Sequence, residues 1–378
     1  MKVEITKEAY LKLKKKVPWL YKNELVSVPQ CDAGSIADLY YRGEYAATAF
    51  INPLSKITAR IISFEKITVD REFFKQRIQK ALEKRKIIKN TNSIRAVHSE
   101  ADFLPGLIVD LYGKNVVTSF TSAGMDNFKG VVIEILIELL NPKGVYEKGD
   151  KIREKEGLEI VSHTLYGEVD NEFLIEENGR KFLTSLKDGQ KTGFFLDQRK
   201  NRQIVGEFGN KRTLDLFSNA GGFGIYAKSE FVKFVEISAL ACSQIKQNCE
   251  LNGIEEYEIV KADVFKFLEK ENKTYDLIIV DPPAFAKNKK ARNGAIKGWK
   301  YLIVNSLKLL EDGGYIALFS CSHSITSKDL LDLALSSSVI DGCYLEVVEF
   351  LKQDIDHPYM INIPNSLYLT GVLLRKSV

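Results

Sequence analysis

The sequence predicts an α/β protein whose C-terminal half is a doubly wound, mostly parallel sheet. From about residue 185 onward, apolar strands alternate with helical segments at regular intervals, which is typical of a sheet with helical crossovers. The strand Tyr275–Val280 is a nearly continuous apolar run, as expected when helices cover both faces of a sheet. We therefore expect polar functional residues to gather where these strands end, at the carboxyl edge of the sheet.

Three segments divide the chain, which at 378 residues is too long for one ordinary core. Residues 1–72 carry short strands between turns, a pattern typical of a small β-barrel, with strands expected at 24–28, 35–40, 45–51 and 57–64. Residues 73–184 are predicted to form a small α/β middle domain, with helices at 73–89 and 126–140 and strands at 93–98, 107–112 and 115–121.

The third domain, residues 185–378, contains the doubly wound sheet. Its expected strands lie at 213–217, 232–236, 257–260, 275–280 and 314–319, and its expected helices at 222–229, 239–251, 264–270, 297–310 and 326–337. Two further apolar stretches, 345–350 and 366–374, are predicted to add an antiparallel pair at one edge of this sheet.

Composition favours a cytoplasmic protein with free thiols. No apolar run approaches the roughly 20 residues of a membrane helix, and the first residues lack the apolar core of a signal peptide. The five cysteines are odd in number and form no Cys-x-x-Cys pair, so we expect neither a disulfide framework nor a metal site. The net charge is only +4, but lysines cluster after residue 286, which suggests a polyanionic substrate.

A glycine-rich turn after the strand at 213–217 predicts a nucleoside pocket. The next strand ends at Glu236, which lies 21 residues after Asp215, at the spacing of an acid that accepts hydrogen bonds from a ribose. Asp263 follows the third strand, where it could contact an adenine amino group. The glycines also match a dinucleotide fingerprint, but they start too late for a pyrophosphate turn, and Asp215 would repel phosphates. Asp215 suits an ammonium group instead, so S-adenosylmethionine fits better than NAD.

Two neighbouring strand ends carry the residues that could perform chemistry. Asp281-Pro282-Pro283 ends one strand, and Ser320-Cys321-Ser322 ends the next. An acid and a thiol should therefore share one edge of the sheet. A cysteine alone is more often a buried core residue, and the partner at Asp281 is what favours a catalytic role for Cys321.

In order along the chain, these motifs resemble a known family, the 23S ribosomal RNA methyltransferases that modify carbon 5 of cytosine, of the large-subunit methyltransferase I type. The resemblance spans the whole chain and is carried by Leu104–Gly106 with Asp110, Thr192–Arg199, Asp215–Phe223, Glu236, Asp263–Phe265, Asp281–Pro283, Ser320–Ser322, Asp356–Pro358 and Ser366–Gly371. It implies an N-terminal PUA domain, a small α/β middle domain and a class I methyltransferase domain with a Rossmann-like sheet. It also implies that Cys321 is the nucleophile.

The motifs and the resemblance together predict which residues contact S-adenosylmethionine: Phe195, Asp215, Phe217, Ser218, Asn219, Ala220, Gly221, Gly222, Glu236, Ile237, Asp263, Val264 and Asp281. RNA contacts are expected from Arg199, Lys287, Lys289 and Phe285, which could stack on an extruded base. The family usually carries a lysine where this chain has Ala284, and Lys287 or Lys289 could substitute for it. An N-terminal module of this kind can bind RNA or support a homodimer.

Carbon 5 of a pyrimidine is a poor nucleophile, so the predicted chemistry must first activate it. A thiolate that adds to carbon 6 pushes electron density to carbon 5. Asp281 would hold or protonate the ring at N3, and an unnamed base would later remove the carbon 5 proton. His323 lies beside Cys321, but the family often has a glycine there.

Three other hypotheses stay open at this stage. A methyltransferase for guanine N7 or another base atom would need no cysteine. An RNA-binding assembly factor with a vestigial pocket would bind no cofactor, and an NAD enzyme is a more remote alternative.

Overall fold

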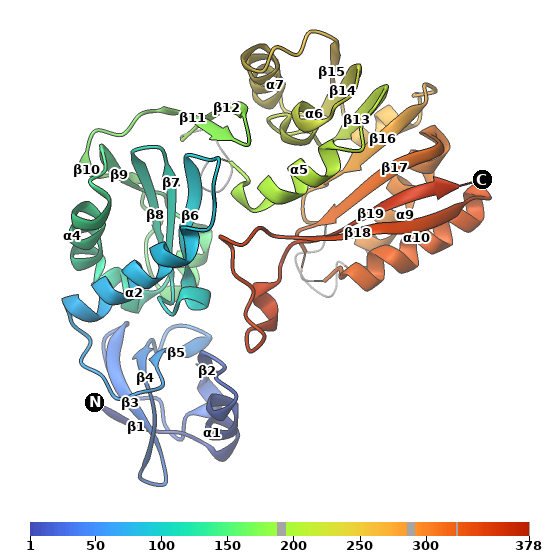
Figure 1. Ribbon diagram of the computed structural model, residues 1–378. Helices are drawn as coiled ribbons and strands as arrows, with labels where there is room; N and C mark the ends of the chain where they lie inside the picture. The colour runs from blue at the N-terminus through green and yellow to red at the C-terminus, as the bar shows by residue number, and fades with distance from the viewer. Residues whose placement is uncertain (187–193, 286–291, 323, 378) are drawn as a thin grey trace. The chain divides into compact units, whose positions relative to one another are not determined.

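A computed structural model describes residues 1–186, 194–285, 292–322 and 324–377 (Figure 1). The chain divides into two compact units. The N-terminal unit comprises Met1–Phe173, Ser185–Phe194 and Ile355–Ser366, and the C-terminal unit comprises Leu174–Thr184, Phe195–Asp354 and Leu367–Val378. The chain therefore passes between the units several times. The predicted domain boundaries at residues 72 and 184 stay predictions.

The first part of the N-terminal unit is a five-stranded sheet. The strand order is β1-β3-β4-β5-β2, with β1 parallel to β3 and the other pairs antiparallel. The strands are β1 (Lys2–Glu4), β2 (Trp19–Tyr21), β3 (Ser35–Tyr41), β4 (Glu44–Ile51) and β5 (Ile57–Ser63). The predicted strand at 24–28 is wrong: Lys22–Glu24 form a 3-10 turn, η1, and Leu25 makes only an isolated bridge to Ile5.

Helix α1 (Lys7–Lys14) in this part was not predicted from the sequence. Its lysines give a strongly polar segment, but Ala9 and Leu13, four residues apart, are buried on one face. The Thr6 hydroxyl accepts a hydrogen bond from the amide of Ala9 at 3.2 Å and so caps the helix start.

The second part of the N-terminal unit is another five-stranded sheet, ordered β10-β9-β8-β7-β6. Its strands are β6 (Ser93–His98), β7 (Leu107–Tyr112), β8 (Asn115–Phe120), β9 (Gly144–Glu147) and β10 (His163–Gly167), and its helices are α2 (Arg71–Arg85), α3 (Ala123–Asn127) and α4 (Lys129–Leu140); the 3-10 turns η2 (Ser99–Asp102) and η3 (Lys151–Glu156) complete it. The predicted helix at 126–140 is two helices, and the first begins before residue 126. Ser122 caps α3, because its hydroxyl accepts from the amide of Met125.

Glu156 connects the two sheets of the N-terminal unit. Its buried carboxylate accepts hydrogen bonds from Arg60 at 2.8 Å, Ser55 at 2.6 Å and Asn52 at 3.1 Å, all from the first sheet's strands and turns. Such a buried charge is tolerated because it is paired and hydrogen-bonded. The two sheets are therefore joined by specific polar contacts as well as by packing.

The C-terminal unit contains the predicted doubly wound sheet. Seven strands follow the order β15-β14-β13-β16-β17-β19-β18, with the first five parallel. The strands are β13 (Arg212–Leu216), β14 (Phe231–Glu236), β15 (Tyr257–Lys261), β16 (Tyr275–Val280), β17 (Leu310–Ser320), β18 (Tyr344–Lys352) and β19 (Thr370–Ser377). The predicted antiparallel pair is confirmed: β19 pairs with both β17 and β18, and β18 forms the edge.

Helices cover both faces of this sheet, as the apolar strands predict (Figure 1). Residues of α8 (Val264–Leu268), α9 (Arg292–Leu309) and α10 (Ser327–Asp341) pack on one face, and residues of α5 (Arg199–Gly206) and α6 (Gly222–Tyr226) pack on the other. The remaining elements are α7 (Ala239–Leu251), the hairpin β11 (Glu172–Glu177) and β12 (Arg180–Ser185), and the 3-10 turns η4 (Leu196–Gln198) and η6 (Pro364–Ser366). No helix among the described residues is long and apolar enough to span a membrane.

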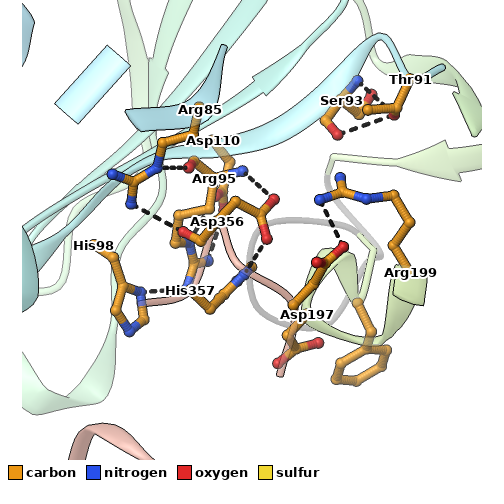
Figure 2. A network of polar contacts seen from close by, with 12 residues as sticks. Arg85, Thr91, Ser93, Arg95, His98, Asp110, Asp197, Arg199, Asp356 and His357 are labelled. Carbon is orange, nitrogen blue, oxygen red and sulfur yellow. Dashed lines mark hydrogen bonds and ion pairs between the residues drawn. The ribbon is translucent and has the colours of Figure 1, made fainter. Parts of the chain in front are cut away.

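A buried polar network holds the segment Ile355–Ser366 within the N-terminal unit (Figure 2). Arg85 binds Asp102 through two nitrogens, at 2.8 and 2.6 Å, and donates to the carbonyl of Asp356. The Asp356 carboxylate in turn accepts from the amide of Arg95 at 3.1 Å and lies 2.9 Å from Nδ1 of His357. The segment after β18 is thus anchored by the guanidinium of Arg85 on α2, which Asp102 of η2 holds in place, and by the backbone amide of Arg95 on β6.

His98 belongs to this network, and its environment opposes protonation. Its ring meets that of His357 edge to face, with the ring centroids 5.2 Å apart. Burial, and then the positive charges of Arg95, His357 and Arg85, hold the pKa of His98 well below its usual value, and Asp356 acts in the opposite direction. In the folded protein His98 is therefore neutral at pH values where an unfolded chain would protonate it.

This predicts a pH dependence of stability. Because the pKa of His98 is lowered on folding, its contribution is fully present above the unfolded pKa of about 6.5 and is lost as the pH falls below that value. The free energy of unfolding of the N-terminal unit should fall by up to about 1.4 kcal/mol per pH unit between roughly pH 6.5 and 5. Urea unfolding followed by the fluorescence of Trp19 in a Trp299→Phe background measures it.

His98→Gln should make stability nearly independent of pH in this window, whereas His163→Gln, which removes an exposed histidine on β10, should leave the dependence intact. Equal slopes for the wild type and His98→Gln would contradict the account.

Candidate active site

The turn after β13 presents its backbone toward the carboxyl edge of the sheet. Phe217, Asn219 and Gly221 all have positive φ, at 61°, 48° and 80°. The Ser218 hydroxyl fixes this turn because it donates to the carbonyl of Asp215 at 2.6 Å and accepts from the amide of Val235 at 3.0 Å. Two left-handed residues that are not glycine indicate a conformation imposed by its surroundings, which is common at ligand sites.

Glu236, at the end of β14, is held next to this turn. One carboxylate oxygen accepts from the amide of Asn219 at 2.9 Å, and the other accepts from the amide of Ser238 at 2.8 Å. Each oxygen has a second lone pair, so the fixed carboxylate can also accept hydrogen bonds from the two hydroxyls of a ribose.

Asp215 is a buried acid that is influenced by the charges of two other acids, Asp281 and Glu236. Its carboxylate accepts from the amide of Gly224 at 2.9 Å. Burial raises the pKa of Asp215 to about 8, the Gly224 hydrogen bond opposes the shift, and the nearby charges of Asp281 and Glu236 add to it. Three acids within electrostatic reach of one another favour a cationic ligand. The ammonium and sulfonium groups of S-adenosylmethionine meet that requirement, whereas a pyrophosphate does not.

The predicted adenine end of the pocket lies beyond Glu236. Asp263 caps α8, with its carboxylate 3.2 Å from the amide of Lys266. Val264 is buried in the core, so only its backbone can meet a ligand, whereas the side chain of Ile237 is 64% exposed and could pack on an adenine. The rings of Phe217, Phe265 and Phe285 lie close by in an aromatic cluster, with centroids 6.1–6.5 Å apart.

Asp281 follows β16, and buried amides orient its carboxylate. Gln198 donates from Nε2 to Asp281 at 3.2 Å, and Asn201 donates to Oε1 of Gln198 at 2.6 Å. Because Oε1 is used as an acceptor, the amide orientation of Gln198 is determined, and its NH₂ group must face Asp281. Gln198 and Asn201 are missed by sequence reasoning; the only signal is their place within and just after the segment Thr192–Arg199.

Cys321 follows β17, the strand next to β16. Val280 pairs with Leu318 in the parallel register, so Asp281 and Cys321 leave the sheet at the same edge, one and three residues beyond that pair. At the spacing of adjacent strands, their Cα atoms are on the order of 10 Å apart. Cys321 is half-buried and is not part of the apolar core clusters.

The start of α10, a few residues after Cys321, is held by contacts with α9. Arg292, the first residue of α9, donates to the carbonyl of Ser324 at 3.1 Å and pairs with Asp329 at 2.5 Å. Thr326 and Asp329 form a reciprocal cap at the start of α10.

The other cysteines differ from Cys321 in their surroundings. Burial raises the pKa of Cys249 to about 12, with smaller contributions from Glu250 and Asp215. Burial also raises the pKa of Cys343 and of Cys242. Cys31 is half-buried in the N-terminal unit and packs against its core. These four thiols have ordinary structural positions, and thiols with a raised pKa are poor nucleophiles.

The residues predicted to bind RNA differ in how accessible they are in the structure. Arg199 is buried and forms an ion pair with Asp354 at 2.8 Å, so a direct RNA contact would require this pair to open. Phe285 packs against Phe217, Phe265 and Trp299. Lys287, Lys289 and His323 lie outside the described residues. Lys297 and Lys300, on α9, are exposed.

Comparison with known proteins now adds to this geometry. The model of a PUA-like domain matches residues 3–64, and that of an S-adenosylmethionine-dependent methyltransferase matches residues 152–361. A protein of Pseudoalteromonas translucida named ribosomal RNA large subunit methyltransferase I is 34% identical over 381 residues, which cover 96% of each chain. A protein of the same name from Aeromonas salmonicida is 35% identical over 379 residues and 95% of each chain. The chain belongs to the ribosomal RNA large subunit methyltransferase I family.

Solved structures agree with this assignment. A crystal structure described as SMU.776, a putative methyltransferase complexed with SAH, is 25% identical, has a TM-score of 0.84 and matches 99% of this chain and all of its own. Trm5b from Pyrococcus abyssi, at 19% identity and a TM-score of 0.54, shows similarity of fold alone. The predictions of the class I methyltransferase fold, the PUA-like domain and S-adenosylmethionine as cofactor are confirmed. The individual site residues stay predictions.

The hydrogen-bonded amides of Gln198 and Asn201 predict an effect on kcat without an effect on cofactor binding. In Gln198→Leu the Asp281 carboxylate loses a fixed donor, so we expect kcat to fall about tenfold or more, as when one positioned hydrogen bond is removed. The Kd for S-adenosylhomocysteine, measured by calorimetry, should change by less than about threefold, because the ribose and ammonium contacts remain.

Gln203→Leu, which changes an exposed glutamine on α5, the helix that directly follows Gln198, is the matched control and should leave both constants unchanged. If Gln198→Leu keeps full kcat, the positioning role is wrong; if it loses cofactor binding in the same proportion as turnover, Gln198 acts on the pocket as a whole.

Proposed function

We propose that this protein transfers a methyl group from S-adenosylmethionine to carbon 5 of a cytosine in 23S ribosomal RNA, with Cys321 as the nucleophile and Asp281 as its partner on the base. The observation that carries the proposal is that β16 and β17 pair in parallel, with Asp281 and Cys321 just beyond their ends. The acid also lies near Asp215 and Glu236 in the cofactor pocket. The shared edge supports the proposal that the thiol acts beside the pocket for an activated methyl group.

The chemistry proposed for these residues is balanced in electrons and protons. The Cys321 thiolate forms a bond to carbon 6, and Asp281 holds or protonates N3, so that an electron pair becomes available at carbon 5. S-adenosylmethionine supplies an electrophilic methyl group, whose bond to the sulfonium breaks as carbon 5 bonds to it. A base then takes the carbon 5 proton, and the electron pair of that bond restores the double bond and expels the Cys321 thiolate. Where Asp281 has protonated N3, N3 returns that proton to Asp281 as the thiolate leaves.

The names of the relatives support ribosomal RNA as the substrate. The proteins that match over 95–96% of their length are named ribosomal RNA large subunit methyltransferase I. A methyltransferase for guanine N7 or another base atom would have no use for Cys321 at the edge of the sheet, and no contact among the described residues favours it.

The N-terminal unit has features that suit RNA. Lys14 lies over the ring of Tyr10 at 4.8 Å, Arg42 lies over the ring of Tyr41 at 5.4 Å, and the two tyrosine rings stack at 4.8 Å. Cations interleaved with aromatic rings can bind phosphates and stack on unpaired bases. These contacts support the proposal that residues 1–72 bind RNA. A second copy of the chain also stays an expected partner.

Replacement of the thiol tests the covalent route. Cys321→Ala should lower the rate of 5-methylcytidine formation by at least about 10³-fold, because carbon 5 is then no longer activated. The Kd for S-adenosylhomocysteine should stay within about threefold of the wild-type value. Cys31→Ala, which removes a half-buried thiol in the N-terminal unit, is the control and should keep wild-type turnover. Nucleoside mass spectrometry of 23S RNA, both as naked transcript and in partly assembled subunits, gives the product.

The outcomes separate the competing hypotheses. Full methylation by Cys321→Ala, or a methyl group on guanine, would mean that no covalent step occurs. Absence of S-adenosylhomocysteine binding by the wild type would favour a non-catalytic assembly factor.

A further inference from the structure

Phe103, directly after the 3-10 turn η2, is an aromatic residue held at the surface of the N-terminal unit. Its side chain is 38% exposed, although its neighbours Asp102 and Leu104 are buried. The backbone of Phe103 has φ 58° and ψ 30°, in the left-handed region, which a bulky side chain rarely adopts. Backbone outliers of this kind are common at ligand sites, and the proposed methyl transfer gives this one no role.

Polar contacts before and at Phe103 hold this conformation in place. The buried carboxylate of Asp102 accepts from the amide of His98 at 2.8 Å and from the guanidinium of Arg85 at 2.8 and 2.6 Å. The carbonyl of Phe103 accepts from a guanidinium nitrogen of Arg77, on α2, at 3.1 Å. The ring is therefore presented in a preorganised position, so a ligand that contacts it does not have to order the turn.

Cations of α2 lie beside the exposed ring. The guanidinium of Arg77 lies 4.8 Å from the ring centroid of Phe73 and 5.3 Å from that of Phe103. The ammonium of Lys84 lies 5.9 Å from the same Phe103 centroid, and Lys80 is exposed. Positions 77, 80 and 84 follow the three- and four-residue spacing of one helix face. These three positive charges and the ring of Phe103 form one surface, the α2–Phe103 surface.

This surface has positive charge to offer an anionic ligand. The acid next to it, Asp102, is shared between Arg85 at 2.6 Å and Lys84 at 3.0 Å. Burial lowers the pKa of Arg77 below its ordinary value, and the charge of Glu65 offsets this only in part. An added anion would therefore stabilise the charged form of this guanidinium.

We propose that the α2–Phe103 surface binds single-stranded RNA, with an unpaired base stacked on the aromatic ring or the guanidinium and the flanking phosphates on the lysines. Aromatic rings beside cations bind single strands in this way, because every base has a face that can stack and every nucleotide carries a phosphate. A double helix keeps its bases inside, so it would meet only the charges. The inference rests on the proposed function, in which RNA is the substrate, and it adds a site separate from residues 1–72.

Binding of short RNAs to the full-length protein tests the role of the ring. The probes are a fluorescein-labelled oligouridine of about 12 nucleotides and an RNA duplex of the same length, both followed by anisotropy. Phe103→Leu keeps an apolar side chain but removes the stacking face, so its Kd for the single strand should rise at least about fivefold, and its Kd for the duplex should stay within about twofold. Phe103→Trp keeps an aromatic ring and should bind both probes within about twofold of the wild type.

The salt dependence of the same binding tests the charges. Lys80→Gln should make the slope of log Kd against log salt concentration smaller by about 0.7, which corresponds to the loss of one phosphate contact of a single strand. Lys75→Gln is the matched control on the same helix, because Lys75 pairs with Glu138 of α4 instead, and it should leave the slope unchanged.

Phe103 and Lys80 belong to the N-terminal unit, whereas the predicted cofactor residues belong to the C-terminal unit, so these variants should keep the wild-type unfolding midpoint and Kd for S-adenosylhomocysteine. Unchanged binding of the single strand by Phe103→Leu would overturn the inference and leave the surface to another ligand. Equal weakening of single strand and duplex would also overturn it, because no base would then stack. A wild type that shows the expected binding but forms no 5-methylcytidine would contradict the proposed function and still support this RNA site.

Discussion

The parallel pairing of β16 with β13 on one side and with β17 on the other is the constraint on which the rest of the site depends. Leu216 pairs with Val280, and Val280 pairs with Leu318. This register brings the turn after β13, the acid after β16 and the thiol after β17 to one edge. A slip of one residue in any of these strands would turn the following side chain toward a helix layer instead. The apolar strands and the helices on both faces fix the register, so the core determines the position of the chemistry.

The second requirement is electrostatic. The charges of Glu236 and Asp281 reach the carboxylate of Asp215, and their repulsion contributes to its raised pKa after burial. A pocket built in this way costs stability when empty and gains from a cation, which is how such a site discriminates between a sulfonium cofactor and a phosphate-bearing one. The buried chain from Asn201 through Gln198 then orients the Asp281 carboxylate.

Sequence patterns predicted the sheet, its edge pair and the placement of Asp215, Glu236, Asp281 and Cys321, because strand periodicity and strand ends are local signals. Other features depend on contacts between residues far apart in the sequence. The α1 helix was missed because only two of its residues face the core, and the strand at 24–28 was predicted from composition although its backbone pairs almost nowhere. Gln198 pairs across 83 residues, and the burial of Arg199 depends on Asp354 at the far end of β18. No window of sequence contains that information.

The most direct test of the central claim is to trap the bond between Cys321 and the base. RNA containing 5-fluorocytidine lacks the carbon 5 proton, so after methyl transfer the base cannot be released, and the thiolate should stay bound to carbon 6. Digestion and mass spectrometry of the product should find the methylated fluorocytidine on the peptide that contains Cys321. An adduct on another residue, or complete turnover of the fluorinated RNA with no adduct, would contradict the account.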